Sequence, residues 1–391
     1  MRAQGVTAAA VMGLVMAAGP AWAGPLTPSG PVAPTMKTLT EVEPRVAVSD
    51  VNTPGTAQSL YRITQPGSYY LTGNITASGK NAIEIVASNV TLDLNGFTLS
   101  GTGPVAGVTA GVLIDSVVVK NGNLENFSGG GIQLATVNLV PLKNVRVENV
   151  RALNCLVGVS VGDSSVVAEC RTTGCSAGVS AGLGSLITHC VTTGASNSGI
   201  RLTGDGVIEQ SVSNGCVIGY QLSGDSVVRD SMATNCTSTG ISLQLGAMAE
   251  RCQVIENASG IVTGANCRVI GCMVVRNSGD GISVTTGCMV EGNTSRENGA
   301  AVADGAGITT RTGTSGCRIA NNTVALNDRG IRVLGTNNFV VGNTAISNPT
   351  NYLIDAGNRV GLIVVPPPSV AISGNSGGGT GATDPMMNLS N

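Results

Sequence analysis

The sequence predicts an all-β solenoid, a coil of short strands in which each turn stacks on the one before. Three observations predict it: a repeat of constant length, a composition rich in glycine and poor in aromatic and charged residues, and columns of equivalent residues that keep register with the repeat. A pair of glycine and an aliphatic residue recurs in steps of 20 or 21 residues, at Gly158, Gly178, Gly199, Gly219, Gly240, Gly260 and Gly281. A period this regular is typical of a repeat architecture.

The composition supports the same fold class. The 391 residues include 55 glycines, 11% charged residues, 2% aromatic residues and 42% hydrophobic residues. This balance fits many short strands joined by glycine turns better than it fits a mixed globular domain or a disordered chain. A solenoid buries one continuous core however long it grows, so we expect one repeat domain.

The first 23 residues are predicted to be a signal peptide. Arg2 precedes an apolar stretch at 6–18, and Ala21, Trp22 and Ala23 follow it as a cleavage site. The apolar stretch is too short for a permanent membrane span, and no later segment reaches about 20 apolar residues. We therefore expect a secreted or periplasmic chain without a membrane span. With 21 basic and 23 acidic residues, the charge balance suggests no nucleic-acid partner.

The mature chain divides into three predicted segments. Residues 24–80 are expected to form a linker and an N-terminal cap, because an open solenoid end would pair with other chains. Residues 81–365 are expected to form a β-helix of about thirteen turns. Residues 366–391 begin with three prolines, continue with Gly and Ser, and are expected to be an irregular tail, either a linker or loosely docked.

Small or asparagine side chains form three further columns, and all eleven cysteines lie on them. The first column is Cys170, Cys190, Ser211, Ser231, Cys252, Cys272, Asn293, Asn322 and Asn343. The second is Cys155, Cys175, Ala195, Cys216, Cys236, Asn257, Asn277, Asn298, Asn327 and Asn348. The third is Ser165, Ser185, Gly206, Ser226, Ala247, Cys267, Cys288, Cys317 and Asn338. We expect the asparagines to hydrogen-bond from turn to turn.

An aliphatic column lies between them and is expected to be the core, at Val167, Ile187, Ile208, Val228, Val269, Val290, Ile319 and Val340, with Ala249 as the exception. Each turn is then interpreted as three short strands with glycine, Asn or Asp at the corners. Equivalent strands would stack in parallel about 4.8 Å apart.

Two stretches give the chain a family resemblance. One is ITQPGSYYLT at 63–72 followed by NVTLDLNGF at 89–97, and the other is CMVVRN at 272–277 leading into GISV at 281–284. With these, residues 63–348 resemble the right-handed parallel β-helix repeat proteins, a superfamily that includes pectin-lyase-like enzymes and NosD-like periplasmic proteins. The resemblance implies the right-handed fold. Its members include lyases, hydrolases, epimerases and adhesins, so the fold alone does not define an activity.

The cysteines allow three interpretations. Stacking in register places Cys155 beside Cys175 and Cys170 beside Cys190, and an exported chain meets an oxidising compartment. Parallel Cβ vectors about 4.8 Å apart exceed the usual separation near 3.8 Å in a disulfide, so we favour buried free thiols that act as small hydrophobic groups. Disulfides and a metal site are the alternatives. No CxxC spacing occurs and histidine ligands are lacking, so no metal site is predicted.

No residue is assigned a catalytic role. The outward residues of the first strand are predicted to be mostly hydroxyl and amide groups, without paired acids: Gln133, Ser160, Ser180, Arg201, Gln221, Ser242, Val262, Ser283, Thr309 and Arg332. His189, the only histidine, could be a general base, but a solvated side chain is the favoured interpretation. The chain also lacks the Gly-His-Gly and clustered Asp motifs of pectin hydrolases with this fold.

Insertions at 299–306 and 311–316 interrupt the repeat on either side of one first-sheet strand. Insertions on a solenoid often form its binding face. We therefore predict a ligand-binding site formed by Asp280, Asp304, Arg311, Arg329 and Arg332, with solvated turns as the alternative.

Alternation of the second strand predicts an outward apolar stripe, interrupted by Arg268 and Arg318. Its members are Val166, Leu186, Val207, Val227, Met248, Met289 and Phe339. An exposed apolar stripe of this kind has three interpretations. The C-terminal tail covers it, a protein partner binds it, or its side chains point inward and the alternation is assigned wrongly.

The sequence thus favours a non-catalytic secreted scaffold or binding protein that contacts polysaccharide, and no cofactor is expected. One alternative is a polysaccharide lyase, hydrolase or epimerase, which requires converging carboxylates, with calcium expected only in a lyase. The other is a NosD-like accessory protein of a periplasmic metal enzyme, which requires accessible metal ligands.

Overall fold

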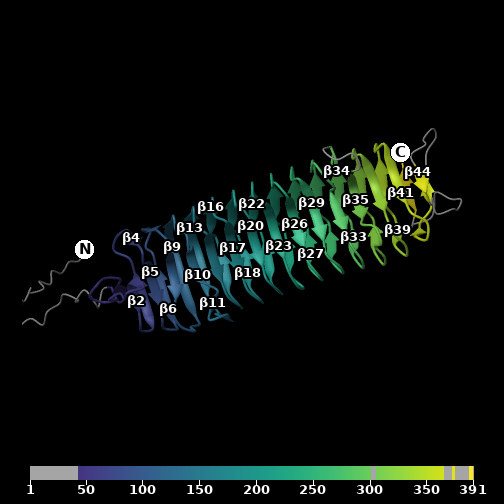
Figure 1. Ribbon diagram of the computed structural model, residues 1–391. Helices are drawn as coiled ribbons and strands as arrows, with labels where there is room; N and C mark the ends of the chain where they lie inside the picture. The colour runs from purple at the N-terminus through teal and green to yellow at the C-terminus, as the bar shows by residue number, and fades with distance from the viewer. Residues whose placement is uncertain (1–42, 301–304, 365–371, 375–386, 391) are drawn as a thin grey trace, which may run out of the picture. The chain divides into compact units, whose positions relative to one another are not determined.

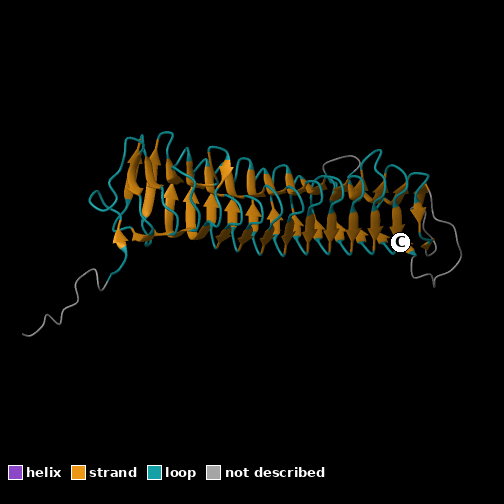
Figure 2. Cartoon of the chain, turned by 90° about the horizontal axis from the view of Figure 1, so that it is seen from below, coloured by secondary structure: helices purple, strands orange, loops and turns teal. Residues whose placement is uncertain are grey.

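A computed structural model describes residues 43–300, 305–364, 372–374 and 387–390. The predicted signal peptide, residues 24–42 of the predicted linker and cap, and the prolines of the tail lie outside this range. From Arg45 onward the chain forms one unit, a parallel β-solenoid built of strands and turns (Figure 1 and Figure 2). None of the described segments is a helix long and apolar enough to cross a bilayer.

Three strands make up a regular turn, and the first of them forms a sheet of its own. This first sheet has 15 strands in chain order. They are β2 (Ser59–Ile63), β5 (Asn81–Ile85), β8 (Ala106–Ala110), β10 (Gly130–Leu134), β14 (Val157–Val161), β17 (Ala177–Ala181), β20 (Ser198–Leu202), β23 (Ile218–Leu222), β26 (Thr239–Leu243), β29 (Ser259–Thr263), β32 (Ile282–Val284), β35 (Ala306–Thr310), β38 (Arg329–Val333), β41 (Thr350–Ile354) and β44 (Ile372–Gly374).

The second and third strands of each turn join into one 28-stranded sheet that bends at a corner. The row of second strands contains β1 (Val46–Ala47), β3 (Gly67–Tyr70), β6 (Val90–Asp93), β15 (Val166–Ala168), β18 (Leu186–Thr188), β21 (Val207–Glu209), β24 (Val227–Arg229), β27 (Met248–Glu250), β30 (Arg268–Ile270), β33 (Met289–Glu291), β36 (Arg318–Ala320), β39 (Phe339–Val341) and β42 (Arg359–Val360).

The row of third strands contains β4 (Ile75–Ser78), β7 (Thr98–Thr102), β16 (Arg171–Thr173), β19 (Val191–Thr193), β22 (Val212–Asn214), β25 (Met232–Thr234), β28 (Gln253–Ile255), β31 (Met273–Val275), β34 (Thr294–Arg296), β37 (Thr323–Ala325), β40 (Thr344–Ile346), β43 (Ile363–Val364) and β45 (Asn388–Ser390). The longer strands β9 (Val117–Glu125) and β13 (Arg146–Leu153) run through both rows. A small antiparallel hairpin, β11 (Thr136–Val137) and β12 (Val140–Pro141), projects from one turn.

The count of about thirteen turns is too low, because the first sheet of the described chain has fifteen strands. Two strands account for the difference. β2 lies inside the predicted cap and pairs in parallel with β5. β44 lies inside the predicted tail and pairs with β41.

The predicted core column is confirmed. Val167, Ile187, Ile208 and their equivalents up to Val340 are 0% exposed, and so is Ala249. Each turn of the first sheet adds an inward aliphatic or aromatic residue, such as Ile200 or Tyr220. Burying one such side chain contributes about 1.5–3 kcal/mol, so every turn adds a similar amount to one continuous core.

The glycine column faces the interior of the coil, where a side chain would not fit. A Cβ atom on Gly158 would lie 2.6 Å from Thr172 Cγ2 and 2.7 Å from the Gly178 carbonyl oxygen. The repeat therefore requires glycine here because of close approach between turns, not because of an unusual φ angle.

A single residue with positive φ makes the corner between the second and third strands. In five successive turns this residue is Glu169, His189, Gln210, Asp230 or Arg251, with φ between 49° and 55°. His189 is thus a corner residue with an exposed side chain, and its Nδ1 lies 2.8 Å from Thr188 Oγ1.

The asparagine columns form hydrogen-bonded ladders, as predicted. Asn257 Nδ2 donates to Asn277 Oδ1 at 3.0 Å, and Asn277 Nδ2 donates to Asn298 Oδ1 at 2.8 Å. The ladder continues through Asn327 and Asn348. Because all these amides are buried, each hydrogen bond of the ladder satisfies one donor and one acceptor, and leaving either without a partner would cost folding free energy.

All eleven cysteines are buried and free, which agrees with their interpretation as small hydrophobic groups. Their thiols donate to carbonyl groups within the same turn, as Cys170 Sγ does to Ala168 O at 3.3 Å and Cys252 Sγ does to Glu250 O at 3.4 Å. Within each of the three columns, the cysteines come before the asparagines along the chain.

The described parts of the C-terminal segment are strands, although the segment was predicted as an irregular tail. β45 lies between β40 and β43 in the third row. Its Asn388 continues the ladder of Asn293, Asn322 and Asn343.

Candidate ligand-binding site

The predicted outward column of the first sheet is confirmed by the strand register. Gln133 stands opposite Ser160, Ser180 opposite Arg201, and the pairing continues turn by turn to Thr309 and Arg332. The result is a strip of hydroxyl, amide and guanidinium groups along the coil, which we call the first-sheet strip.

A cavity of about 330 Å³ opens at the C-terminal part of the first-sheet strip, over β29, β32, β35 and β38. Ser283 and Thr309 form its floor, and both are almost fully buried although they point outward. Its other lining residues are Ser259, Val262, Asp280, Thr310, Arg311, Thr312, Arg332 and Leu334.

Arg332 is held on one wall of this cavity. Its Nε donates to Thr309 Oγ1 at 2.9 Å, and its Nη2 lies 3.6 Å from Asp280 Oδ1. Asp280 Oδ1 also accepts the backbone N–H of Ala306 at 2.8 Å. The side chains of Arg332 and Asp280 are 17% and 26% exposed, so water screens this pair only in part.

Arg311 follows β35 directly and is held much less firmly. Its Nε lies 3.5 Å from Ser283 Oγ, which is the outer limit of a hydrogen bond. Among the residues that the structure describes, no carboxylate oxygen lies within the 4.0 Å of an ion pair from it. Its planar guanidinium can therefore offer its donors to an oxyanion.

The structure brings together three of the five predicted site residues, namely Asp280, Arg311 and Arg332. Arg329 begins β38 opposite Ala306 and does not line the cavity. Asp304 lies outside the described residues. The cavity residues Thr310 and Leu334 were not predicted from the sequence. A hydrogen bond joins them, in which the Leu334 N–H donates to Thr310 Oγ1 at 2.7 Å.

Carboxylates are sparse on the described part of the first-sheet strip. Its other acid, Glu84, is near the N-terminal end, where Arg62 Nε lies 3.1 Å from its Oε2. The described part of the cavity itself contains one carboxylate, that of Asp280. The described lining thus combines two guanidinium groups, one carboxylate and several hydroxyl groups, with one more positive than negative charge.

The predicted apolar stripe does point outward. Val166, Leu186, Val207, Val227 and Met248 are in register and half-buried. The described strands β44 and β45 of the C-terminal segment extend the two sheets. A protein partner on this stripe stays a prediction.

The continuous parallel coil with its polar outer strip has the fold of a right-handed parallel β-helix. A family model described as "Right handed beta helix region" matches residues 177–324. No curated protein sequence matches the chain.

Two solved structures illustrate the fold. The A-module of mannuronan C-5 epimerase AlgE4 from Azotobacter vinelandii matches 75% of this chain and 87% of its own, at 14% identity and a TM-score of 0.50. A double mutant of the tailspike protein of E. coli bacteriophage HK620, in complex with pentasaccharide, matches 89% of this chain and 78% of its own, at 13% identity and a TM-score of 0.53. At this identity the likeness concerns the fold.

Proposed function

We propose that this protein is a non-catalytic extracytoplasmic scaffold that binds an acidic polysaccharide along the first-sheet strip, with its main contacts in the cavity of Asp280, Arg311 and Arg332. One observation carries the proposal. Arg311 presents a guanidinium without a carboxylate partner in the described residues, beside a second guanidinium and a buried hydroxyl floor.

A linear polymer suits the strip, because polar side chains repeat about every 4.8 Å along the coil axis. A polysaccharide offers hydroxyl and ring oxygens along its length to such a row of hydroxyl and amide groups. Two similar structures support this choice: one is named as a mannuronan epimerase and the other holds a pentasaccharide.

An acidic sugar suits the cavity because guanidinium groups form paired, charge-assisted hydrogen bonds with carboxylate or sulfate oxygens. Asp280 holds Arg332 in place, and the described lining of the cavity keeps one excess positive charge. Binding is then expected to weaken as the salt concentration rises.

The test is a binding titration of the mature chain against polymannuronate, polygalacturonate and a neutral polysaccharide. We expect an acidic polymer to bind, the neutral one not to bind, and Arg311→Gln and Arg332→Gln each to weaken binding about tenfold, as the loss of a charged hydrogen bond does. Arg268→Gln is the matched control, since Arg268 is exposed on the second row and lies off the strip. Equal binding by the wild type and both cavity variants would overturn the proposal.

A carbohydrate-active enzyme is the second candidate, because Asp280 places a carboxylate beside two arginines in a groove on the outside of a β-helix. Product assays for 4,5-unsaturated uronates, new reducing ends and C-5 epimerisation, with and without calcium, distinguish it from a binding protein. Activity that disappears in Asp280→Asn or Asp304→Asn would establish the enzyme; bound but unchanged polymer supports the scaffold.

A further inference from the structure

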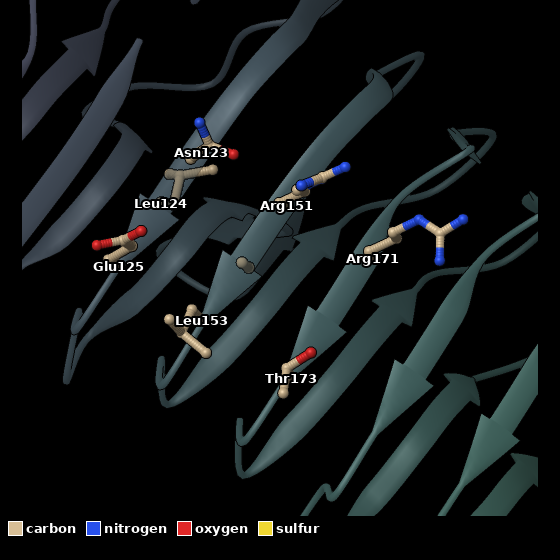
Figure 3. A pocket seen from close by; sticks show the side chains of 8 residues that line it. Asn123, Leu124, Glu125, Arg151, Leu153, Arg171 and Thr173 are labelled. Carbon is tan, nitrogen blue, oxygen red and sulfur yellow. The ribbon is translucent and has the colours of Figure 1, made fainter. Parts of the chain in front are cut away.

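A second cavity lies on another face of the coil, over the third strands. It has a volume of about 510 Å³ and lies across the end of β9, the end of β13 and β16. Asn123, Glu125, Arg151, Leu153, Arg171 and Thr173 are among its lining residues (Figure 3). A smaller cavity of about 180 Å³ adjoins it and shares Asn123 and Arg151.

Two arginines stand next to each other in this cavity. Arg151 pairs with Arg171 in the parallel register of β13 and β16, and Asn123 of β9 is the next residue in the same row. Paired residues of neighbouring parallel strands are about 4.8 Å apart, so the two side chains start side by side. Figure 3 shows both guanidinium groups directed outward from adjacent strands.

A like-charged pair in a ladder is unfavourable unless an opposite charge lies close by. Two arginines elsewhere on the coil meet such a charge. Arg229 Nη2 lies 2.7 Å from Glu209 Oε2, and Arg276 Nε lies 2.9 Å from Glu256 Oε1.

Arg151 and Arg171 have no such partner in the part of the chain that the structure describes. The acid of their own cavity, Glu125, makes no ion pair with either of them. The neighbouring Glu148 is engaged by Arg146, whose Nε lies 2.6 Å from its Oε2.

We infer that Arg151 and Arg171 form a second anion-binding site, which takes a sulfate or carboxylate substituent of an acidic sugar. Two parallel guanidinium groups can each donate two hydrogen bonds to one oxyanion, and the anion removes their mutual repulsion. Thr173 adds a hydroxyl donor at the edge of the cavity, and Leu153, 39% exposed, adds an apolar surface for the face of a sugar ring. The choice of a sugar as the carrier of the anion rests on the proposed function, whereas the inference of an anion site does not depend on it.

The experiment measures binding of three disaccharides by calorimetry: one with a sulfate group, one with a uronate carboxylate and one uncharged. We expect a charged disaccharide to bind the wild type and to lose at least tenfold in affinity on the Arg151→Gln/Arg171→Gln variant. The Arg268→Gln/Arg359→Gln variant is the control, since it removes the same charge from exposed positions of the second row. The sulfated and carboxylated sugars identify which oxyanion the site prefers.

Comparison with Arg311→Gln separates this inference from the proposed function. Loss of binding only in Arg311→Gln would overturn the second site and retain the first, whereas loss only in Arg151→Gln/Arg171→Gln would do the reverse. A second experiment uses only the wild type, so its result does not depend on whether a variant folds. Phenylglyoxal modifies accessible arginines, and the bound disaccharide should protect Arg151 and Arg171 from modification, as measured by mass spectrometry of the peptides. Absence of protection would refute the site.

Discussion

Asn343 Nδ2 donates a hydrogen bond to Asn388 Oδ1 at 3.1 Å, although 45 residues separate them. The backbone N–H of Asn343 donates to the same oxygen at 3.0 Å. Asn388 in turn donates to Gly361 O and Val340 O. The last described strand thus closes the asparagine ladder at the C-terminal end of the coil.

Replacement of Asn388 should loosen this end. Asn388→Ala leaves the buried backbone N–H of Asn343 without its acceptor, which costs about 1–3 kcal/mol, whereas Asn343 Nδ2 keeps Ile319 O and Val341 O as acceptors. We expect faster hydrogen exchange in β40, β43 and β45, with little change in the first half of the coil, because a solenoid transmits stability mainly between neighbouring turns. Leu389→Ala, at a residue 38% exposed, is the control, and an equal effect of both changes would contradict the ladder.

The glycine column should not tolerate alanine. Gly158→Ala places a methyl group 2.6 Å from Thr172 Cγ2, so the turns must move apart at a cost of about 1–3 kcal/mol. Gly194→Asn is the contrasting change, because Gly194 has a φ of 65° with open space beside it and asparagine accepts this conformation. Urea titrations of both variants check the prediction; similar midpoints would show that the column is not tightly packed.

Alkaline pH should destabilise the fold. Burial raises the pKa of the Cys236 thiol to about 12 from an ordinary value of 9.0, and burial also raises the pKa of Tyr220 and Tyr352. Above pH 9 the unfolded chain releases the Cys236 proton while the folded chain keeps it, so stability falls as pH rises towards 12. This thiol alone contributes up to about 1.4 kcal/mol per pH unit. Denaturant midpoints between pH 8 and 11 measure the slope, which Cys236→Ala should reduce.

The eleven thiols should be inaccessible in the folded protein. Since all are buried and free, we expect almost no reaction with a thiol reagent under native conditions and eleven equivalents after denaturation without reductant. A smaller number after denaturation would reveal disulfides between stacked cysteines.

The corner position of His189 predicts a neutral substitution. His189→Asn keeps a residue type that accepts its φ of 53°, so we expect stability to change by less than about 0.5 kcal/mol and glycan binding to be unaffected. Thermal melts and the binding titration test this. A large loss of binding or product formation would support the general-base alternative for this residue.

Much of the fold could be predicted from the sequence because a solenoid repeats the same local environment. The spacing from Gly158 to Gly281, the aliphatic column at Val167 and the asparagine columns each report contacts between neighbouring turns, which recur at a constant separation. The outward strip from Gln133 to Arg332 followed from strand alternation alone. These features depend on period and side-chain type, and both are written in the chain.

The remaining features needed the tertiary structure because they break the repeat. Asn388 follows Asn343 by 45 residues, which is not a step of the repeat, so no constant spacing predicted it as a ladder residue. The convergence of Asp280 with Arg332 depends on how β32, β35 and β38 stack. The isolation of Arg151 and Arg171 from the described acids depends on distances between strands. The sequence by itself determined the architecture and the polar face, whereas the three-dimensional packing decided which charges meet and which have no ion-pair partner among the described residues.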